Sequence, residues 1–271
     1  MKGDVIAIDL GGTHLRTALV RGHKVIRYIK KDTPKEKNAL VCEMAESISQ
    51  LMSRDIKGIG VASPGPLKNG IILNPPNLPL RYFNLKRFLE KKFKVPVVIE
   101  NDAKCVAIAE AKLGCRKKHF FILTLGTGIG GGVIINNEIY IGSDYGAELG
   151  QIVLDDGRNL EDLWKDHRRL SEKYFGHVIL MADLIKMKDK RAKKIVEDTT
   201  KYLGQGIASL INVFDPEVVI LSGGIKEAGR KLLKMIKKNV YPYVMLPKKT
   251  PIRWTSLDHP GIKGASLLIK D

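Results

Sequence analysis

The sequence has few cysteines and no long hydrophobic run. Only three of its 271 residues are cysteines, Cys42, Cys105 and Cys115, and their odd number and spacing exclude a disulfide framework or a cysteine-rich metal site. No apolar stretch is long enough to span a bilayer, and Asp9 interrupts the first apolar run before a signal peptide could develop. These absences predict a protein of the reducing cytoplasm with no membrane partner.

Acidic side chains are scarce relative to basic ones. The chain has 46 Lys and Arg against 29 Asp and Glu, a net charge of +17, and such an excess is typical of proteins that bind nucleic acid. The basic residues are nevertheless divided among separate helix-like segments, at 86–94, 186–194 and 231–238. No helix-turn-helix, zinc-finger or aromatic RNA-binding motif accompanies them, so we expect no nucleic-acid partner.

The remaining composition is that of a globular protein with mixed secondary structure. With 44% hydrophobic residues, the chain can bury a core large enough for two lobes. Strand-like runs alternate with segments of helical spacing, as where 36–53 is followed by 58–62. A strand-turn-strand opening followed by helix-strand units occurs in both halves. The pattern predicts a duplicated α/β fold.

Two glycine turns each follow an apolar, strand-like run. One is DLGGT at 9–13, and the other is LGTGIGGG at 125–132. Glycines let backbone N–H groups surround an anion without interference from a β-carbon, and the threonine hydroxyls add donors. Either turn alone is equally compatible with a simple tight hairpin, but two in one chain indicate a nucleotide site.

The second turn also has the GxGxxG spacing of dinucleotide-binding proteins, at Gly126, Gly128 and Gly131. That motif has to open a helix. Here residues 133–135 and 139–141 flank an Asn-Asn pair, which predicts a hairpin. The amino-terminal turn likewise leads into a predicted meander of strands, so the sequence disfavours a Rossmann fold.

Asp102 lies where a predicted strand gives way to a predicted helix. It follows the apolar run 95–99 and precedes 103–113, and ligands of open α/β sheets bind at the carboxyl ends of strands. An aspartate at this place is also typical of a helix N-cap, and the two roles do not exclude each other. A third glycine turn, at 222–224, follows the strand-like run 218–221.

These motifs resemble those of the ROK family of sugar kinases. Residues 9–18 resemble the family's first phosphate motif, 125–132 its second, 222–224 its adenosine motif and 259–265 its closing segment. The four stand in the family's order and extend over essentially the whole chain.

The resemblance implies an α/β fold of two ribonuclease-H-like lobes, of the actin/hexokinase type, with the active-site cleft between the lobes. Residues 1–102 and 255–271 would form the N-terminal lobe, and 103–254 the C-terminal lobe.

The implied activity is transfer of the γ-phosphoryl group of Mg-ATP to a hexose hydroxyl, first of all the 6-OH of glucose. Asp102 would be the general base, and Asp9 would hold Mg²⁺ through ATP unless it only forms the turn. The residues that would contact the sugar are Gly65, Asn77, Asn101, Asp102, Glu148, Gln151 and Glu161. Those that would contact ATP are Asp9, Gly11, Gly12, Thr13, Arg16, Gly126, Thr127, Gly128, Gly130, Ser222, Gly223 and Gly224.

The chain departs from the family at one place. Gln151 replaces a family histidine, and 152–160 lacks the cysteine-rich zinc run, so we expect no structural zinc and leave the sugar open among glucose, other hexoses and N-acetylhexosamines. A non-catalytic sugar or nucleotide sensor and a simple ATPase remain alternatives. Only residues 1–4 precede the first predicted strand, which disfavours a DNA-binding repressor. Family relatives imply a homo-oligomer.

Overall fold

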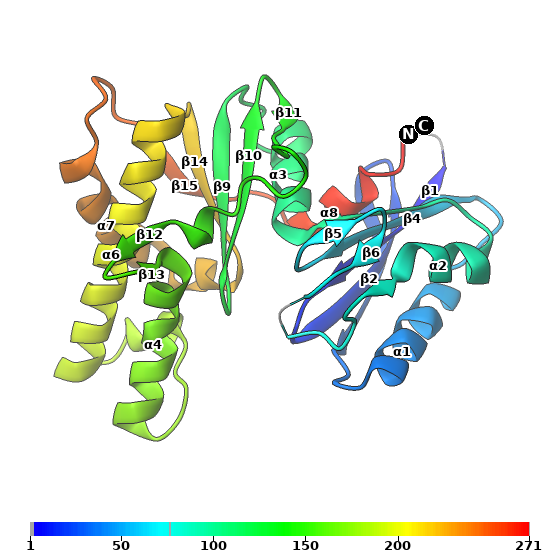
Figure 1. Cartoon of the computed structure of the whole chain (residues 1–271), viewed down its shortest axis with the longest axis horizontal. Coiled ribbons are helices and arrows are strands. Elements are labelled where there is room, and N and C mark those ends of the chain that lie inside the picture. The colour runs from blue at the N-terminus through cyan, green and yellow to red at the C-terminus, as the bar shows by residue number, and fades with distance from the viewer. Residues whose placement is uncertain (1–2, 76, 271) are drawn as a thin grey trace. The chain divides into compact units, whose positions relative to one another are not determined.

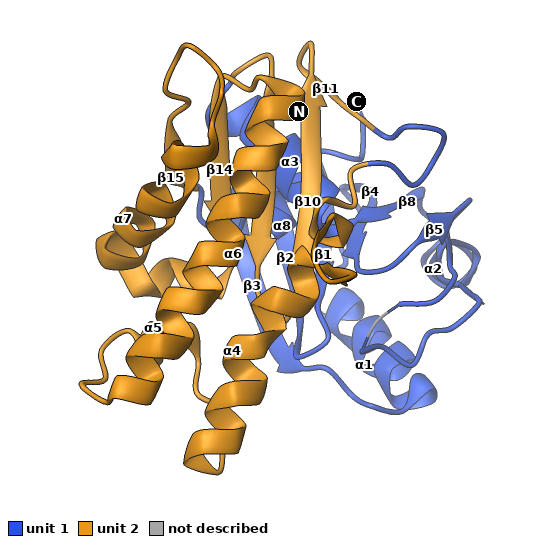
Figure 2. Ribbon diagram, turned by 60° about the vertical axis from the view of Figure 1, so that its left-hand side comes forward, with its two compact units in different colours: residues 1–116, 141–146, 257–271 blue, residues 117–140, 147–256 orange. Residues whose placement is uncertain are grey.

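The computed structural model describes residues 3–75 and 77–270, and the chain divides into two compact units (Figures 1 and 2). Unit 1 comprises residues 1–116, 141–146 and 257–271. Unit 2 comprises residues 117–140 and 147–256.

Unit 1 contains a five-stranded sheet with the order β3-β2-β1-β4-β8. Its strands are β1 (Asp4–Leu10), β2 (His14–Arg21), β3 (Lys24–Asp32), β4 (Ile56–Ser63) and β8 (Val97–Asn101). The first three form the predicted antiparallel meander, while β4 runs parallel to β1 and β8 runs parallel to β4. The carboxyl ends of β1, β4 and β8 therefore meet at one edge of the sheet.

Both faces of this sheet are covered by helices. They are α1 (Lys37–Ser49), α2 (Leu85–Phe93), α3 (Asp102–Leu113) and α8 (Pro260–Ser266). Large apolar side chains of α1 and α2 fill one face, whereas α3 and α8 meet the other through small residues such as Ala7, Ala18 and Cys105. A β-carbon on Gly264 of α8 would lie 1.9 Å from the Cys105 carbonyl oxygen, so α8 and α3 approach at backbone distance. A small sheet of β5 (Leu67–Lys68), β6 (Ile71–Ile72) and β7 (Phe83–Asn84) completes the unit.

Unit 2 repeats the strand arrangement of unit 1. Its five-stranded sheet has the order β11-β10-β9-β14-β15. The strands are β9 (Phe120–Leu125), β10 (Ile129–Ile135), β11 (Glu138–Ile139), β14 (Val218–Ser222) and β15 (Ile252–Trp254). Again three antiparallel strands are followed by two parallel ones, and Asn136 and Asn137 form the predicted hairpin turn with φ of 54° and 68°. The predicted duplication is thus confirmed.

The helices of unit 2 pack against its sheet around one large apolar core. They are α4 (Leu160–Phe175), α5 (Met181–Leu184), α6 (Lys190–Phe214) and α7 (Gly229–Val240), with short 3₁₀ segments η1 (Leu149–Gln151), η2 (Gly224–Ala228) and η3 (Tyr241–Tyr243). The small residues Gly204, Gly206 and Ala208 let α6 lie close to its neighbours, with a β-carbon on Gly204 2.5 Å from that of Asn239 in α7. A two-stranded hairpin, β12 (Val153–Asp155) and β13 (Arg158–Asn159), precedes α4.

The unit boundaries differ from the predicted lobe boundaries. Unit 1 extends beyond Asp102 to Arg116, because α3 packs against α8 of the same unit. It also includes Ile141–Gly146, a segment predicted to belong wholly to the second lobe, and it resumes at Leu257 rather than at Thr255.

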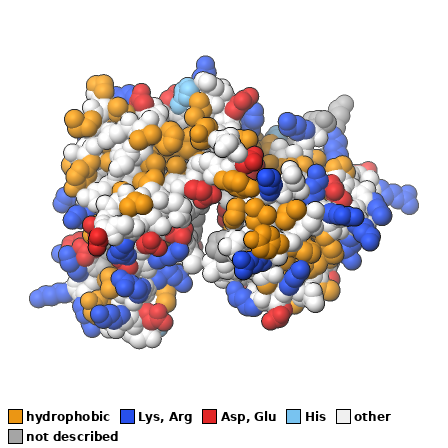
Figure 3. Space-filling model, in the orientation of Figure 1, with side chains coloured by type: hydrophobic (Ala, Val, Ile, Leu, Met, Phe, Trp, Pro, Cys, Tyr) orange, Lys and Arg blue, Asp and Glu red, His pale blue; other side chains and the backbone are white. Residues whose placement is uncertain are grey.

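The described helices include none that combines the length and apolarity required to cross a bilayer. On the face shown in Figure 3, lysine and arginine side chains are spread over the surface among acidic and hydrophobic ones. The positive charge of the chain is therefore not gathered into one patch on that face.

Candidate active site

The first glycine turn lies at the carboxyl end of β1 and is held by three hydrogen bonds. The Gly11 N–H donates to the His14 carbonyl at 3.0 Å, which closes the turn. Thr33 Oγ1 donates to the Gly11 carbonyl at 2.6 Å, and Lys35 Nζ donates to the Gly12 carbonyl at 2.9 Å. Among the residues that the structure describes, the bonds that fix the turn do not use the Gly12 and Thr13 N–H groups, which an anion would need.

Asp9 lies beside this turn and faces Arg16 across the β1–β2 ladder. Arg16 Nη1 donates to Asp9 Oδ2 at 3.2 Å, and 23% of the Asp9 side chain is exposed. Burial raises the pKa of the Asp9 carboxyl, while Arg16 and His259 act to lower it. A single partly exposed carboxylate suits Mg²⁺, which takes one or two protein carboxylates and completes its shell with phosphate oxygens and water.

The loops predicted to line the sugar site also belong to unit 1. Gly65 has φ of 88°, and a β-carbon there would lie 2.6 Å from Pro75 Cα, so only glycine fits. A β-carbon on Gly12 would lie 2.9 Å from Asn77 Cβ. The structure therefore brings Asn77, a predicted sugar residue, against the first glycine turn.

Asn101, rather than Asp102, caps α3. The Asn101 side-chain oxygen accepts hydrogen bonds from the N–H groups of Ala103 and Lys104 at 3.0 and 3.1 Å, so the N-cap role considered for Asp102 is wrong. Asp102 is the first residue of the helix, and its Oδ1 accepts from the Ala103 N–H at 2.8 Å.

Asp102 and Asp9 lie in the same neighbourhood of unit 1. The pKa of the Cys105 thiol is raised well above its usual range, first by burial and then by the negative charges of Glu100, Asp102 and Asp9. The carboxyl ends of β1 and β8 lie at the same edge of the unit 1 sheet, with β4 between them, so Asp9 and Asp102 belong to that edge.

The second glycine turn joins β9 to β10 and is fixed from behind by α4. Trp164 Nε1 donates to the Gly126 carbonyl at 3.0 Å, and the Ile129 N–H donates to Glu161 Oε2 at 2.8 Å. The turn enters strand β10 and not a helix, which excludes the Rossmann interpretation.

The third glycine turn lies next to the second. Ser222 pairs with Thr124 of β9. Gly223 has φ of 102°, and a β-carbon there would lie 2.3 Å from the Leu125 carbonyl oxygen, which leaves no room for a larger residue. The predicted adenosine motif and the predicted second phosphate motif are therefore adjacent in unit 2.

The predicted sugar residues of unit 2 lie on η1 and α4. Glu148 precedes η1, Gln151 ends it, and a β-carbon on Gly150 would lie 2.5 Å from the Ile129 carbonyl oxygen, so η1 packs against β10. Gln151 Oε1 accepts from Asn159 Nδ2 at 3.0 Å. The Glu161 carboxylate holds the second glycine turn through the Ile129 N–H and pairs with Lys165 at 2.5 Å.

Comparison with known protein families identifies the family of this chain. The model of the ROK family matches residues 5–169 and 157–271. The chain belongs to the ROK family. It is 29% identical to a glucokinase of Thermotoga maritima, over the full chain and 98% of that protein, and 29% identical to a xylose repressor of Bacillus spizizenii, over 90% of the chain and 73% of the repressor. A crystal structure of a ROK hexokinase from Thermus thermophilus superposes with a TM-score of 0.84 at 30% identity, over 98% of this chain and 97% of that one.

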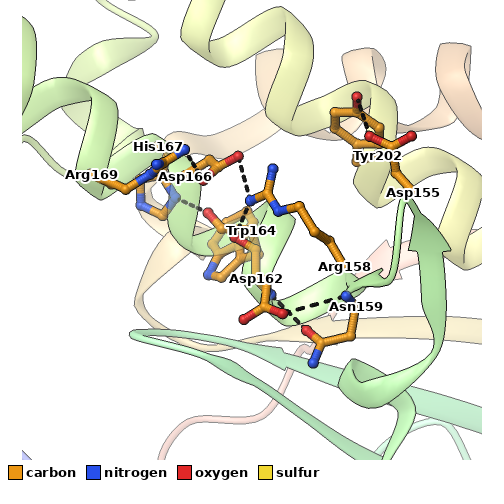
Figure 4. Close-up of polar contacts among 9 residues, drawn as sticks. All are labelled: Asp155, Arg158, Asn159, Asp162, Trp164, Asp166, His167, Arg169 and Tyr202. Atoms are coloured by element: carbon orange, nitrogen blue, oxygen red, sulfur yellow. Dashed lines mark hydrogen bonds and ion pairs between the residues drawn. The ribbon is translucent and has the colours of Figure 1, made fainter.

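In this ROK protein, polar contacts hold the segment 152–160 in place. Arg158 Nη2 lies 2.7 Å from Asp166 Oδ2, and Asp166 also pairs with Arg169 at 3.0 Å (Figure 4). Asn159 and Asp162 form a capping box at the start of α4, and the Tyr202 hydroxyl donates to Asp155 at 3.1 Å. These contacts fasten the β12–β13 hairpin to α4 and α6.

We expect this segment to be stable without metal. Dialysis against a strong zinc chelator should leave the melting temperature unchanged, whereas Asp166→Asn, which removes the partner of two arginines, should lower it by about 2–4 °C. Asp183→Asn, which breaks an exposed pair with Lys186, is the matched control and should have no measurable effect. A chelator-induced fall in melting temperature would contradict the expectation. Differential scanning calorimetry measures all three.

His167 lies in α4 and is buried beside Trp164. Its ring lies 4.7 Å from the indole, and Nδ1 lies 2.6 Å from the Trp164 carbonyl. Because a carbonyl only accepts, Nδ1 carries the hydrogen. Burial lowers the pKa of His167 from 6.5 to about 4.

The lowered pKa of His167 predicts a pH-dependent stability. Between pH 6.5 and about 4 the unfolded chain binds a proton at this site that the folded chain does not, so folding loses up to about 3 kcal/mol as the pH falls through that window. His167→Gln should flatten the slope of unfolding free energy against pH in this window, and His177→Gln, at an exposed histidine, should not. Equal slopes in wild type and His167→Gln would refute the assignment; urea titrations at several pH values measure them.

Three residues of the site carried no signal in the sequence. Thr33 and Lys35 follow β3 far along the chain from the first turn, and Trp164 lies on the buried face of an amphipathic helix, where an aromatic side chain is ordinary core. Only the folded arrangement shows that each holds a carbonyl of a glycine turn.

Proposed function

We propose that this ROK protein is an ATP-dependent sugar kinase that transfers the γ-phosphoryl group to a hexose hydroxyl, with the 6-OH of glucose as the first candidate. The observation that carries the proposal is the edge of the unit 1 sheet. There Asp102 directly follows β8, at the same edge of the sheet as Asp9 and the first glycine turn at the end of β1. The Thermotoga glucokinase and the Thermus hexokinase support this activity over rival ones.

Asp102 is the proposed general base. A sugar hydroxyl is not ionised at neutral pH, so a carboxylate within hydrogen-bond reach orients it and accepts its proton as the oxygen bonds to phosphorus. Asn101 is proposed to bind a neighbouring hydroxyl. Its Oδ1 is occupied by the cap of α3, which leaves the amide Nδ2 to donate to the sugar.

The glycine turns are proposed to hold the nucleotide. In unit 1 the Gly12 and Thr13 N–H groups, and in unit 2 those of Thr127 and Gly128, are the donors for phosphate oxygens. Ser222, Gly223 and Gly224 are proposed to contact adenosine. Bound Mg²⁺ would neutralise charge on the β- and γ-phosphates, and Asp9 is the residue proposed to hold it.

Glu148, Gln151 and Glu161 are the proposed sugar contacts of unit 2, with Gly65 and Asn77 those of unit 1. Gln151, at the position of the family histidine, has an amide that can both donate and accept hydrogen bonds. Because its oxygen is held by Asn159, the NH₂ group is the part that can turn to a sugar hydroxyl.

The rival function is a non-catalytic sensor, favoured by the likeness to a xylose repressor. ADP release from Mg-ATP separates the possibilities when it is measured without acceptor and with glucose, mannose, fructose, N-acetylglucosamine or N-acetylmannosamine. Release that rises with one sugar identifies a kinase and its acceptor. Release that ignores every sugar indicates an ATPase, and ligand-stabilised melting without release indicates a sensor.

A further inference from the structure

Trp164 lies in an unusual place for a core tryptophan. Trp164 is 2% exposed and lies within the apolar core of unit 2. Its one polar side-chain atom, Nε1, nevertheless donates a hydrogen bond to the Gly126 carbonyl of the second glycine turn at 3.0 Å. The other face of α4 at this level is polar and pairs with the β12–β13 hairpin (Figure 4). The indole therefore links α4 to the turn from the protein side.

Trp164 and Glu161 each bind a backbone group of the second glycine turn, which limits the backbone groups that could bind a ligand. The Gly126 N–H donates to the Gly128 carbonyl at 3.0 Å, and the Ile129 N–H is taken by Glu161. Within residues 3–75 and 77–270, no hydrogen bond uses the N–H of Thr127 or Gly128. Thr127 is exposed, so these two donors are left for an anion at the tip of the turn.

The indole is itself held in place. The His167 ring lies against it at 4.7 Å, and His167 Nδ1 donates to the Trp164 carbonyl at 2.6 Å. The capping box of Asn159 and Asp162 fixes the first turn of the same helix. These contacts fix the position of the indole N–H that donates to the Gly126 carbonyl.

We propose that Trp164 is a positioning residue for phosphate binding: by holding the Gly126 carbonyl, it fixes the peptide plane that also carries the Thr127 N–H, and so keeps that donor in place for an anion at the tip of the turn. The proposal rests on the proposed function, since it takes the turn to bind a nucleotide phosphate. Without the indole N–H, the peptide between Gly126 and Thr127 can rotate, because glycine tolerates many conformations. Loss of the indole N–H should therefore weaken the binding of ligands that carry phosphate.

The experiment compares Trp164→Phe with Trp254→Phe. Trp254 is the other tryptophan of the chain, and its Nε1 donates to the Gly229 carbonyl at 3.2 Å, so both variants keep an aromatic ring and lose one bond to a glycine carbonyl. Dissociation constants are measured for ADP and for adenosine by competition. Trp164→Phe should weaken ADP about three- to ten-fold, the scale of one buried hydrogen bond, and adenosine less than two-fold. Trp254→Phe should change neither beyond two-fold.

A second readout uses the Trp254→Phe protein, in which Trp164 is the only indole. ADP should alter its fluorescence with a midpoint at the dissociation constant, and adenosine should not. Equal effects of the two substitutions, equal weakening of ADP and adenosine, or an indole that ignores ADP would each overturn the proposal. A wild-type protein that binds ADP but phosphorylates no sugar would contradict the kinase function alone, and the comparison of variants would still decide the role of Trp164.

Discussion

Asp102→Asn is expected to lower sugar-dependent turnover by about two to four orders of magnitude, the scale of losing a positioned base. The affinity for Mg-ATP should stay nearly unchanged, because the glycine turns and Asp9 are intact. The amide keeps the size of the carboxyl and can still accept from the Ala103 N–H, so α3 and its Asn101 cap should persist. Steady-state kinetics with the identified sugar, together with nucleotide titration, measure both quantities.

Two further variants test whether the effect is local. Asp183→Asn makes the same change in the first turn of α5 and should keep full activity. Asp102→Glu keeps a carboxylate but moves it by one methylene, and we expect a turnover between those of wild type and Asp102→Asn. If Asp102→Asn retains more than a tenth of wild-type turnover, Asp102 is not the base.

Asp9→Asn has the second largest expected effect. Removing the carboxylate proposed to hold Mg²⁺ should reduce kcat/KM by about two to three orders of magnitude and raise the Mg²⁺ concentration needed for half-maximal nucleotide binding. The fold should tolerate the change, because burial already disfavours the charged form of Asp9 and the asparagine oxygen can still accept from Arg16. Nucleotide binding titrated with and without Mg²⁺ gives a readout independent of turnover.

Asp4 offers a matched control at the opposite end of β1. Arg21 Nε and Nη2 each donate to its carboxylate at 2.8 Å, and this pairing holds the pKa of Asp4 below its usual range. Asp4→Asn should therefore cost stability, about 2 kcal/mol, while leaving the Mg²⁺ dependence unchanged. If both variants shifted the Mg²⁺ requirement equally, the role proposed for Asp9 would fail.

Much of the fold could be predicted from the sequence because it is encoded locally. Apolar runs that end in glycine predict strands followed by turns, and an Asn-Asn pair between apolar residues predicts the β10–β11 hairpin, where both asparagines adopt the left-handed conformation. Repetition of the same order of elements in both halves predicted the duplicated sheets.

Long-range packing could not be predicted in this way. The extension of unit 1 to Arg116 depends on backbone contact between α3 and α8, whose residues Cys105 and Gly264 are distant in sequence. Asn101, the residue before Asp102, is the N-cap of α3 because its side-chain oxygen accepts hydrogen bonds from two N–H groups of the first turn. Likewise Trp164 has the spacing of a core residue, and only its hydrogen bond to Gly126 shows a second role.

The central claim is phosphoryl transfer to a sugar, and ³¹P NMR of wild-type protein with Mg-ATP and each of the five sugars tests it most directly. The account predicts that one sugar, first of all glucose, yields a phosphate monoester in step with ADP and little inorganic phosphate. Inorganic phosphate formed at the same rate with and without sugar, or no reaction with any of the five, would contradict it.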